Sequence, residues 1–303
     1  MLQHEVGRAW RSIPWNDVLE QRLSADKYFM RSGLIRKDLL PLYAQDVMPW
    51  TRVVGSYDEL VDALSNDTPK NDDAPPLRYV LKLCDSSNAF GIFFFDDASL
   101  TYDLFLDKQK RVVQRYISPW LGHRHRKFHL RVLVLAVGHL DVYVFHDVRA
   151  LVATEAYRDD ALDNPLVHVT NLSANKEAPT YNEAAQNLAL SDVTGLDHDQ
   201  ILDQIHASVR VVFQNLTRAR NRRHFFSLPN CYELFGWDFM VDSAGRALLL
   251  EVNPDPSLRM YHHGAAIVPL DVLTNGVPPN TFTRVFSLQA AKALASLRRH
   301  TSS

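Results

Sequence analysis

Two apolar runs joined by a short polar turn constrain the fold of this chain more than any other feature of its sequence. Residues 231–241 and 247–254 are rich in aromatic and aliphatic side chains, and the segment Asp-Ser-Ala-Gly at 242–245 lies between them. Apolar runs of strand length that flank such a turn are typical of a β-hairpin. We therefore expect a hairpin whose two strands are largely buried.

Three polar side chains interrupt these runs: Asp238 in the first, and Glu251 and Asn253 in the second. If residues 242–245 close a two- or four-residue turn, Asp238 lies opposite Leu249. Glu251 and Asn253 then share its face, because side chains alternate along a strand. A three-residue turn without a bulge would separate them. Two carboxylates and an amide oxygen that converge are ligands for a hard cation, and Mg²⁺ shared with substrate phosphates fits them best.

An ordinary hairpin whose acidic side chains face solvent accounts for the same pattern. A short pattern of this kind often occurs by chance. The apolar neighbours favour the metal site, because a buried carboxylate without a cation or a donor costs several kcal/mol or shifts its pKa.

The composition indicates a soluble globular protein with a large core. Of its 303 residues, 46% are hydrophobic and 22% are charged, which gives room for two or three subdomains. A net charge of -2 carries no general signal for nucleic acid or an anionic membrane. The two cysteines are too few for a disulfide framework, which suits a reducing compartment. With no secretory signal and no apolar run of spanning length, we expect an intracellular protein that does not enter a membrane.

Basic side chains upstream of the hairpin indicate a site for phosphates. Lys82 lies in an expected strand over 78–84, and the turn of small residues at 85–91 suits backbone contact with phosphate. The run His-Arg-His-Arg-Lys at 123–127 precedes Arg131, and an expected strand over 132–137 follows it. We expect this cluster to recognise phosphates or an acidic peptide. Nucleic acid ranks below both, because no repeat of basic and aromatic residues accompanies the cluster.

Three further segments bear on the organisation of the chain. Residues 66–76 are polar and proline-rich and are interpreted as a linker. Residues 30–40 are basic, and we interpret them as a solvated helix face rather than a nucleotide contact. Residues 282–299 are expected to form a closing amphipathic helix.

Several of these stretches resemble the tubulin tyrosine ligase-like family of ATP-grasp ligases. The resemblance is carried by YELFGWDFMVD and LLLEVNPDPSL around the hairpin, HRKFHLRV at 125–132, VVQRYI at 112–117 and HVTN at 168–171. It implies an α+β ATP-grasp fold that holds the nucleotide between two α+β subdomains. We expect an N-terminal segment and linker over 1–75, a small central subdomain over 76–118 and a catalytic subdomain over 119–303.

The resemblance also implies roles for individual residues. Mg²⁺ is expected on Asp238, Glu251 and Asn253. The phosphates of ATP are expected to contact Lys82 and Lys127. The adenine is expected to contact Gln114, Arg115, Tyr116 and Ile117, and Thr170 and Asn171 are expected to line the rest of the nucleotide site. Arg131 would orient the carboxylate of the acceptor, and with Glu251 and Asn253 it makes up the expected catalytic group. We expect Asp238→Asn and Glu251→Gln to abolish Mg²⁺-dependent ATP turnover and to leave the fold intact.

The implied activity is an ATP-dependent carboxylate–amine ligase that adds a free amino acid to a protein through an acylphosphate. Its implied cofactors are ATP and Mg²⁺, and its acceptor is an acidic protein tail, for which the tail of tubulin is one candidate. Such an acceptor suits a cytoplasmic protein, and a tubulin acceptor would associate it with the cytoskeleton. The alternative is a catalytically degenerate ATP-grasp domain that binds a nucleotide or a protein.

Three departures from the family pattern support the alternative. The loop after Lys82 contains only one glycine, Gly91. His129 stands where aspartate is usual, and we expect it to add positive charge. Leu151 stands where a substrate-binding arginine is expected, and Arg149 is the residue that would have to replace that contact.

Overall fold

The computed structural model describes residues 3–5, 7–67, 77–86, 90–159, 162–176, 178–218, 223–261, 272–278 and 280–292. Most of the expected linker, the centre of the turn after Lys82 and the end of the expected C-terminal helix lie outside these residues. Within them, no helix is both long and apolar enough to cross a bilayer.

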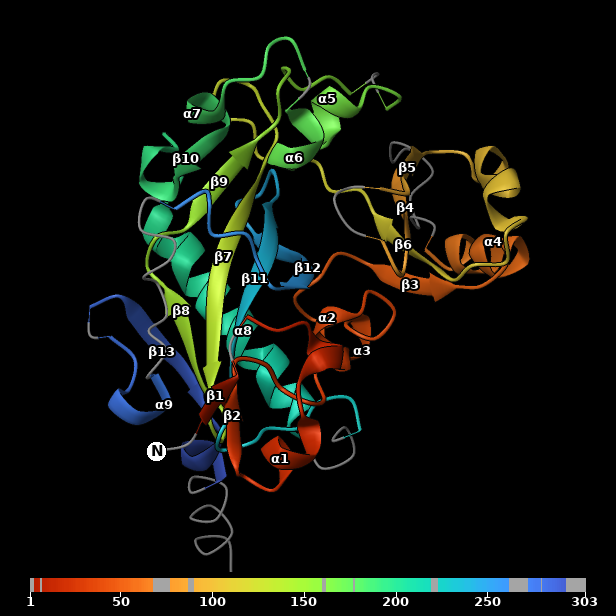
Figure 1. Ribbon diagram of the computed structural model, residues 1–303. Helices are drawn as coiled ribbons and strands as arrows, with labels where there is room; N and C mark the ends of the chain where they lie inside the picture. Colours follow the sequence, from red (N-terminus) through yellow and green to blue (C-terminus); the bar gives the residue numbers. More distant parts are fainter. Residues whose placement is uncertain are drawn as a thin grey trace, which may run out of the picture.

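A large antiparallel sheet forms the centre of the molecule (Figure 1). Its strand order is β10-β9-β7-β11-β12, and β8 and β13 extend it from the same edge of β7 as β9. The strands are β7 (Phe128–Val137), β8 (Asp141–Phe145), β9 (Arg149–Val152), β10 (Asn187–Ala189), β11 (Tyr232–Val241), β12 (Ala247–Pro254) and β13 (Phe282–Ser287). The expected hairpin is therefore β11 and β12, and β11 lies between β7 and β12 in the sheet.

The long helix α8 (His198–Leu216) covers one face of this sheet (Figure 1). It begins where Asp197 accepts a hydrogen bond from the backbone N–H of Gln200, an N-cap that satisfies one free donor of the first turn. Its apolar residues recur with helical spacing and pack in one cluster with Phe235 and Trp237 of β11. This packing leaves the opposite face of β11 free for polar side chains.

A second antiparallel sheet is smaller and has the order β3-β6-β4-β5. Its strands are β3 (Thr51–Val54), β4 (Tyr79–Leu83), β5 (Ile92–Phe95) and β6 (Arg111–Arg115). The helices α4 (Tyr57–Ser65) and η2 (Ala98–Phe105) pack on it through Leu60 and Phe105. Strand β3 and helix α4 thus belong to this sheet, although both precede residue 76, where the small subdomain is expected to begin.

The remaining N-terminal elements pack on the large sheet. They are β1 (Gln3–Glu5), η1 (Trp10–Ser12), α1 (Trp15–Leu19), β2 (Leu23–Ala25), α2 (Ser32–Ile35) and α3 (Pro41–Ala44). Leu34 and Leu40 belong to the same buried cluster as the residues of α8 and β11. The short elements α5 (Pro165–His168), α6 (Leu172–Asn175), α7 (Glu183–Gln186), η3 (Leu190–Asp192) and α9 (Val272–Asn275) complete the assigned structure. The molecule is α+β, as predicted.

The expected C-terminal helix over 282–299 is wrong at its start. Residues 282–287 form β13, which pairs with β8, and helical residues begin only at 288. Phe282, Val285 and Phe286 are buried by this pairing. Aromatic and β-branched residues favour strands when a partner strand is available, and β8 supplies that partner.

Candidate active site

A cavity lies between the two sheets and gathers most of the predicted site residues. Strands β4, β5 and β6 and the residues that follow β6 line one side of it, and β7, β11, β12 and the segment 168–171 line the other. The predicted residues that line it are Lys82, Gln114, Arg115, Tyr116, Ile117, Lys127, Thr170, Asn171, Asp238 and Glu251. Arg131 and Asn253 line an adjoining cavity, to which Glu251 and Asn171 also contribute. The two cavities therefore meet at the hairpin.

The hairpin turn differs from the one expected. The backbone N–H of Asp242 donates to the carbonyl of Arg246 at 3.0 Å, so residues 243–245 form a three-residue turn. Gly245 adopts φ +76°, a left-handed conformation that glycine reaches without strain. Alone, this turn would place Asp238 opposite Leu250 and point Glu251 to the other face.

A β-bulge restores the common face. Phe239 pairs with Leu249 but Asp238 pairs with Glu251, so Leu250 is an extra residue on β12. The predicted pairing of Asp238 with Leu249 is therefore wrong, whereas the predicted convergence is present. Asn253 Nδ2 lies 3.0 Å from Asp238 Oδ2 and 3.5 Å from Glu251 Oε1.

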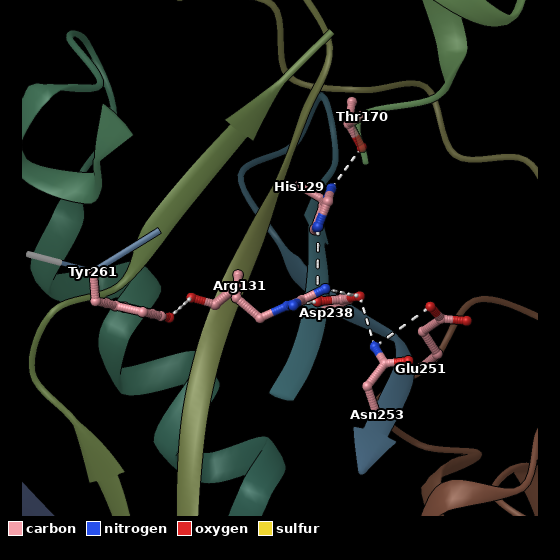
Figure 2. Close-up of polar contacts among 7 residues, drawn as sticks. All are labelled: His129, Arg131, Thr170, Asp238, Glu251, Asn253 and Tyr261. Atoms are coloured by element: carbon pink, nitrogen blue, oxygen red, sulfur yellow. Dashed lines mark hydrogen bonds and ion pairs between the residues drawn. The ribbon is translucent and has the colours of Figure 1, made fainter. Parts of the chain in front are cut away.

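Asp238 is the most constrained residue of the site (Figure 2). Arg131 lies directly opposite it on β7 and donates from Nε to Oδ1 at 2.5 Å and from Nη2 to Oδ2 at 3.0 Å. Burial raises the pKa of this carboxyl, but the contributions of Arg131, His129 and the Asn253 hydrogen bond together outweigh burial, so the pKa is lowered from its usual value. Asp238 is thus ionised although it is only 4% exposed.

These oxygen donors suit a hard cation that is shared with a second ligand. The described part of the chain contains no group of three His, Cys, Asp or Glu side chains suited to a metal ion. The hairpin instead supplies two carboxylates and one amide, a set that leaves coordination positions for phosphate oxygens and water, as Mg²⁺ requires. The Asn253 amide presents nitrogen to the carboxylates, and a half-turn about its last bond would present oxygen.

Two buried lysines face this pair of carboxylates. Lys82 Nζ donates to Gln114 Oε1 at 3.0 Å, and Gln114 Nε2 donates in turn to Thr51 Oγ1 at 3.0 Å. Lys127 Nζ lies 4.3 Å from the centre of the Tyr116 ring, an arrangement that stabilises a cation. Neither ammonium forms an ion pair with a carboxylate of the described chain.

The pKa values of these lysines follow from their burial. Desolvation lowers the pKa of Lys82, and desolvation together with the charge of Lys82 lowers the pKa of Lys127 to about 7. An anion that enters the cavity would favour the charged form of both lysines. The pair is therefore suited to a polyanion such as a polyphosphate.

The part of the cavity away from the carboxylates is apolar and aromatic. It is lined by Val80, Ile92, Phe94, Tyr116, Ile117, Met240 and Leu250. The Tyr116 hydroxyl and His168 Nδ1 are hydrogen-bonded at 2.8 Å. Arg115 lines the cavity, but its guanidinium bonds to Asp67, with Nε 3.1 Å from Oδ2. This end suits the flat face of a base, for which Phe94, His168 and Met240 add contacts that sequence reasoning missed.

His129 is neutral rather than cationic. Its Nδ1 lies 2.5 Å from Thr170 Oγ1, and its Nε2 lies 3.7 Å from Asp238 Oδ1. Burial lowers the pKa of His129 to about 4, and the charges of Arg131 and Lys127 act in the same direction, whereas those of Asp238 and Glu251 oppose it. The predicted positive charge at this position is wrong at neutral pH.

The adjoining cavity contains Leu151 but not Arg149. Leu151 lines it beside Arg131, with Lys176 and Arg259 at its exposed part. Arg149 uses its guanidinium on Asn187, with Nε 3.0 Å from Oδ1 and Nη2 3.0 Å from the backbone carbonyl. Arg149 therefore does not replace the arginine expected at position 151.

Lys37 belongs to the site although it was assigned to a solvated face. Helix α2 ends at Ile35 and the next residue is extended, which carries Lys37 toward β12. Its Nζ lies 3.6 Å from Glu251 Oε2 and donates to the carbonyl of Ser86 at 2.5 Å. No local pattern in residues 30–40 shows which of their basic side chains turns inward.

Comparisons with known proteins identify several relatives of this chain. A probable tubulin–tyrosine ligase of Schizosaccharomyces pombe is 34% identical over 153 residues, which cover 49% of this chain and 36% of that protein. The human probable tubulin polyglutamylase TTLL2 is 29% identical over 196 residues, which cover 60% of this chain and 32% of that protein. The chain thus spans about a third of the length of these curated relatives.

The fold and the family follow from two further matches. The crystal structure of the C-terminal domain of K. lactis Pby1, an ATP-grasp enzyme, superposes with a TM-score of 0.67 at 22% identity and covers 95% of this chain and 88% of that one. The fold is therefore an ATP-grasp fold. The model of the tubulin-tyrosine ligase family matches residues 19–274. With most of its length inside that match, the chain belongs to the tubulin-tyrosine ligase family.

Proposed function

We propose that this chain is an ATP-dependent carboxylate–amine ligase that joins a free amino acid to a protein acceptor. One observation carries the proposal: Lys82 and Lys127, two buried lysines that form no ion pair within the described residues, line the same cavity as Asp238 and Glu251. The lysines suit phosphate oxygens, and the acidic pair suits a cation that neutralises them.

The proposed reaction has two steps. A carboxylate oxygen attacks the γ-phosphorus of ATP and ADP leaves, which forms an acylphosphate. An amine nitrogen then attacks its carbonyl carbon, inorganic phosphate leaves, and the nitrogen loses a proton. Lys82 and Lys127 stabilise the charge on the transferred phosphoryl group. Mg²⁺ held by Asp238, Glu251 and Asn253 would supply further positive charge against the phosphates.

The acceptor we propose is an acidic protein tail, and tubulin is one candidate because relatives are described as tubulin ligases and polyglutamylases. A tubulin acceptor would place the protein in the cytoplasm and on the cytoskeleton. We assign the acceptor to the adjoining cavity, which Arg131 lines. Arg131 pairs with Asp238 through Nε and Nη2. Leu151 replaces the arginine that would contact a carboxylate of the substrate. The proposed acceptor therefore differs in length or charge from an acceptor that needs this arginine.

A second candidate is a nucleotide- or protein-binding module without ligase activity. The observation in its favour is that the Arg131 guanidinium already holds Asp238 in a bidentate pair, which engages the group expected to orient the acceptor. Such a domain would still bind ATP.

The test of the proposed function combines binding with turnover. Mg²⁺-ATP should raise the midpoint of thermal unfolding through mass action, and Lys82→Ala should reduce that rise. The wild type should also incorporate labelled tyrosine, glutamate or glycine into tubulin or an acidic peptide, whereas Glu251→Gln should not. Binding without incorporation would favour the nucleotide-binding module. No shift at millimolar ATP would reject the ligase and favour a degenerate domain that does not bind the nucleotide.

A further inference from the structure

The adjoining cavity, to which we assign the acceptor, contains two cations that form no ion pair within the described residues. These are Lys176 and Arg259, and both side chains are exposed. Arg131 also lines the cavity, but its guanidinium is bonded to Asp238. Leu151 contributes no charge. An anionic group that enters this cavity would therefore meet its available positive charge at the exposed part.

Three carboxylates line the same cavity, and lysines pair with two of them. Lys27 Nζ lies 2.7 Å from Asp255 Oδ1, and Lys37 Nζ lies 3.6 Å from Glu251 Oε2. The third carboxylate belongs to Glu183, which is exposed. The two ion pairs leave two cations against one carboxylate, so the exposed part of the cavity favours an acidic ligand.

Arg259 belongs to the short segment 255–260, which follows β12 and forms a wall of the cavity. Asp255 begins the segment at φ +50°, a left-handed conformation that aspartate and asparagine adopt more readily than most residues. At the other end, the carbonyl of Met260 accepts a hydrogen bond from Asn187 Nδ2 at 3.0 Å. Contacts at both ends therefore set the position of Arg259.

Lys27 holds the start of this segment from the N-terminal part of the chain. Its side chain is only 5% exposed, whereas that of Asp255 is 62% exposed, so the ammonium reaches from the interior to a carboxylate at the surface. The other carboxylate beside Lys27 is that of Asp26, with Oδ1 at 3.7 Å. A buried ammonium costs free energy unless it is paired, so Lys27 favours the conformation in which Asp255 stays against it.

We propose that Arg259 binds a side-chain carboxylate of the acidic acceptor, and that the ion pair between Lys27 and Asp255 positions the segment that carries Arg259. Arg259 is then a binding residue, and Lys27 is a positioning residue. The contact comes from the segment after β12 rather than from β9, where Leu151 stands. This inference rests on the proposed function, because it requires that the acceptor is an acidic protein segment.

The first experiment measures how Arg259 affects discrimination between acceptors. The substrates are a glutamate-rich peptide and the same peptide with all but one glutamate replaced by glutamine, each with Mg²⁺-ATP and the labelled amino acid that the wild type incorporates. Arg259→Gln should raise the KM for the glutamate-rich peptide roughly tenfold or more, the range of a hydrogen bond between charged groups. Its kcat and its affinity for ATP should not change, because the lost contact binds ground state and transition state alike.

Two comparisons separate charge recognition from a general loss. The KM of Arg259→Gln for the glutamine-substituted peptide should equal that of the wild type, because that peptide lacks the carboxylate. Arg259→Lys keeps the charge but not the planar donor, so it should lie between wild type and Arg259→Gln. Arg22→Gln is the matched control, because it removes an exposed arginine, 56% exposed, outside the cavity and should leave both KM values unchanged.

The second experiment tests the positioning role with a double-mutant cycle. Asp255→Asn removes the charge but keeps a residue that tolerates positive φ, and Lys27→Met removes the ammonium but keeps an apolar side chain. Each should raise the KM for the glutamate-rich peptide about two- to fivefold, the range of a partly exposed ion pair. The double variant should show no more than either single change, because both break one contact. Asp26→Asn is the control and should keep the wild-type KM. Lys27→Gln replaces Lys27→Met if that variant is unstable.

The outcomes distinguish the two roles from the proposed function. A KM raised for the glutamate-rich peptide alone, with non-additive effects of Lys27→Met and Asp255→Asn, supports the inference. An unchanged KM in Arg259→Gln, or an equal rise for both peptides, overturns the role of Arg259 and leaves the proposed function standing. Additive or absent effects of Lys27→Met and Asp255→Asn overturn the positioning role. If the wild type incorporates no amino acid into either peptide, the proposed function fails and this inference fails with it.

Discussion

At the scale of single residues, the site depends on how each charge is balanced. Asp238 and Arg131 are both buried and bonded through two hydrogen bonds, so neither can lose its partner without leaving a buried charge. Gly236 allows this packing, because an added Cβ would lie 3.3 Å from Arg131 Cδ and 2.9 Å from Pro256 Cβ. Glu251 is more exposed and pairs with a lysine that is not fully buried.

This difference predicts unequal effects of two similar substitutions. Asp238→Asn should lower the free energy of unfolding by about 3–5 kcal/mol, because it leaves the Arg131 guanidinium buried without a countercharge. Glu251→Gln should lower it by less than about 1 kcal/mol. Urea denaturation of the ligand-free proteins measures both values.

From sequence we expect both variants to keep the fold intact. The structure instead predicts that Asp238→Asn destabilises the fold and that Glu251→Gln leaves it almost unchanged. Both should still lose metal-dependent ATP binding. Equal unfolding free energies for the two variants would contradict the importance of the Arg131 pair.

At the scale of secondary-structure elements, β6 shows how one strand serves both the sheet and the cavity. Gln114 bonds with Lys82 of β4 and Thr51 of β3, whereas Arg115 bonds with Asp67 beyond α4. The Asp67 side chain is 5% exposed and also accepts a hydrogen bond from the Tyr79 hydroxyl at 3.2 Å. The guanidinium of Arg115 therefore holds α4 to the sheet rather than reaching into the nucleotide cavity.

Arg115→Ala should consequently act on stability and not on ATP. Removing one of two partners from the buried Asp67 should cost about 1–3 kcal/mol of unfolding free energy. ATP affinity, measured by calorimetry, should stay at the wild-type value. Tyr116→Ala is the comparison variant and should weaken ATP, because its ring lines the apolar end of the cavity. A weaker ATP affinity in Arg115→Ala at unchanged stability would return Arg115 to the nucleotide site.

At the scale of the whole molecule, the site exists only because two sheets face each other. The two lysines that we propose to bind phosphate come from different sheets, with Lys82 on β4 and Lys127 immediately before β7. The two sheets have separate hydrophobic cores. A nucleotide bound in the cavity would therefore contact both sheets and connect them.

Hydrogen exchange of backbone amides tests this arrangement. Mg²⁺-ATP should slow exchange in β4 and β6 and also in β11 and β12, because ligand binding stabilises the elements that it connects. Helix α9 and strand β13 should be unaffected. Lys82→Ala is the control, in which the protection should shrink in both sheets together. Protection confined to one sheet would place the nucleotide outside the cavity between them.

Much of the fold and of the candidate site follows from local sequence. Apolar runs with turn residues between them predict β4 and the hairpin, because strand periodicity is encoded over a few neighbouring residues. Local sequence also predicts that Asp238, Glu251 and Asn253 form one group. Polar side chains in buried strands need partners, because burying them alone costs free energy. The resemblance then predicts two phosphate-binding lysines beside them, Lys82 across the cavity and Lys127 on the same side.

Tertiary structure alone decided the features that depend on distant residues. The bulge at Leu250, the strand at 282–287 and the inward turn of Lys37 each require a pairing partner that lies far away in sequence. The neutral state of His129 depends on burial beside Arg131 and Lys127, and desolvation cannot be read from a residue's own neighbours in the chain. Local sequence determines which residues are available for the site, whereas strand register and burial determine which of them meet and what charge they carry.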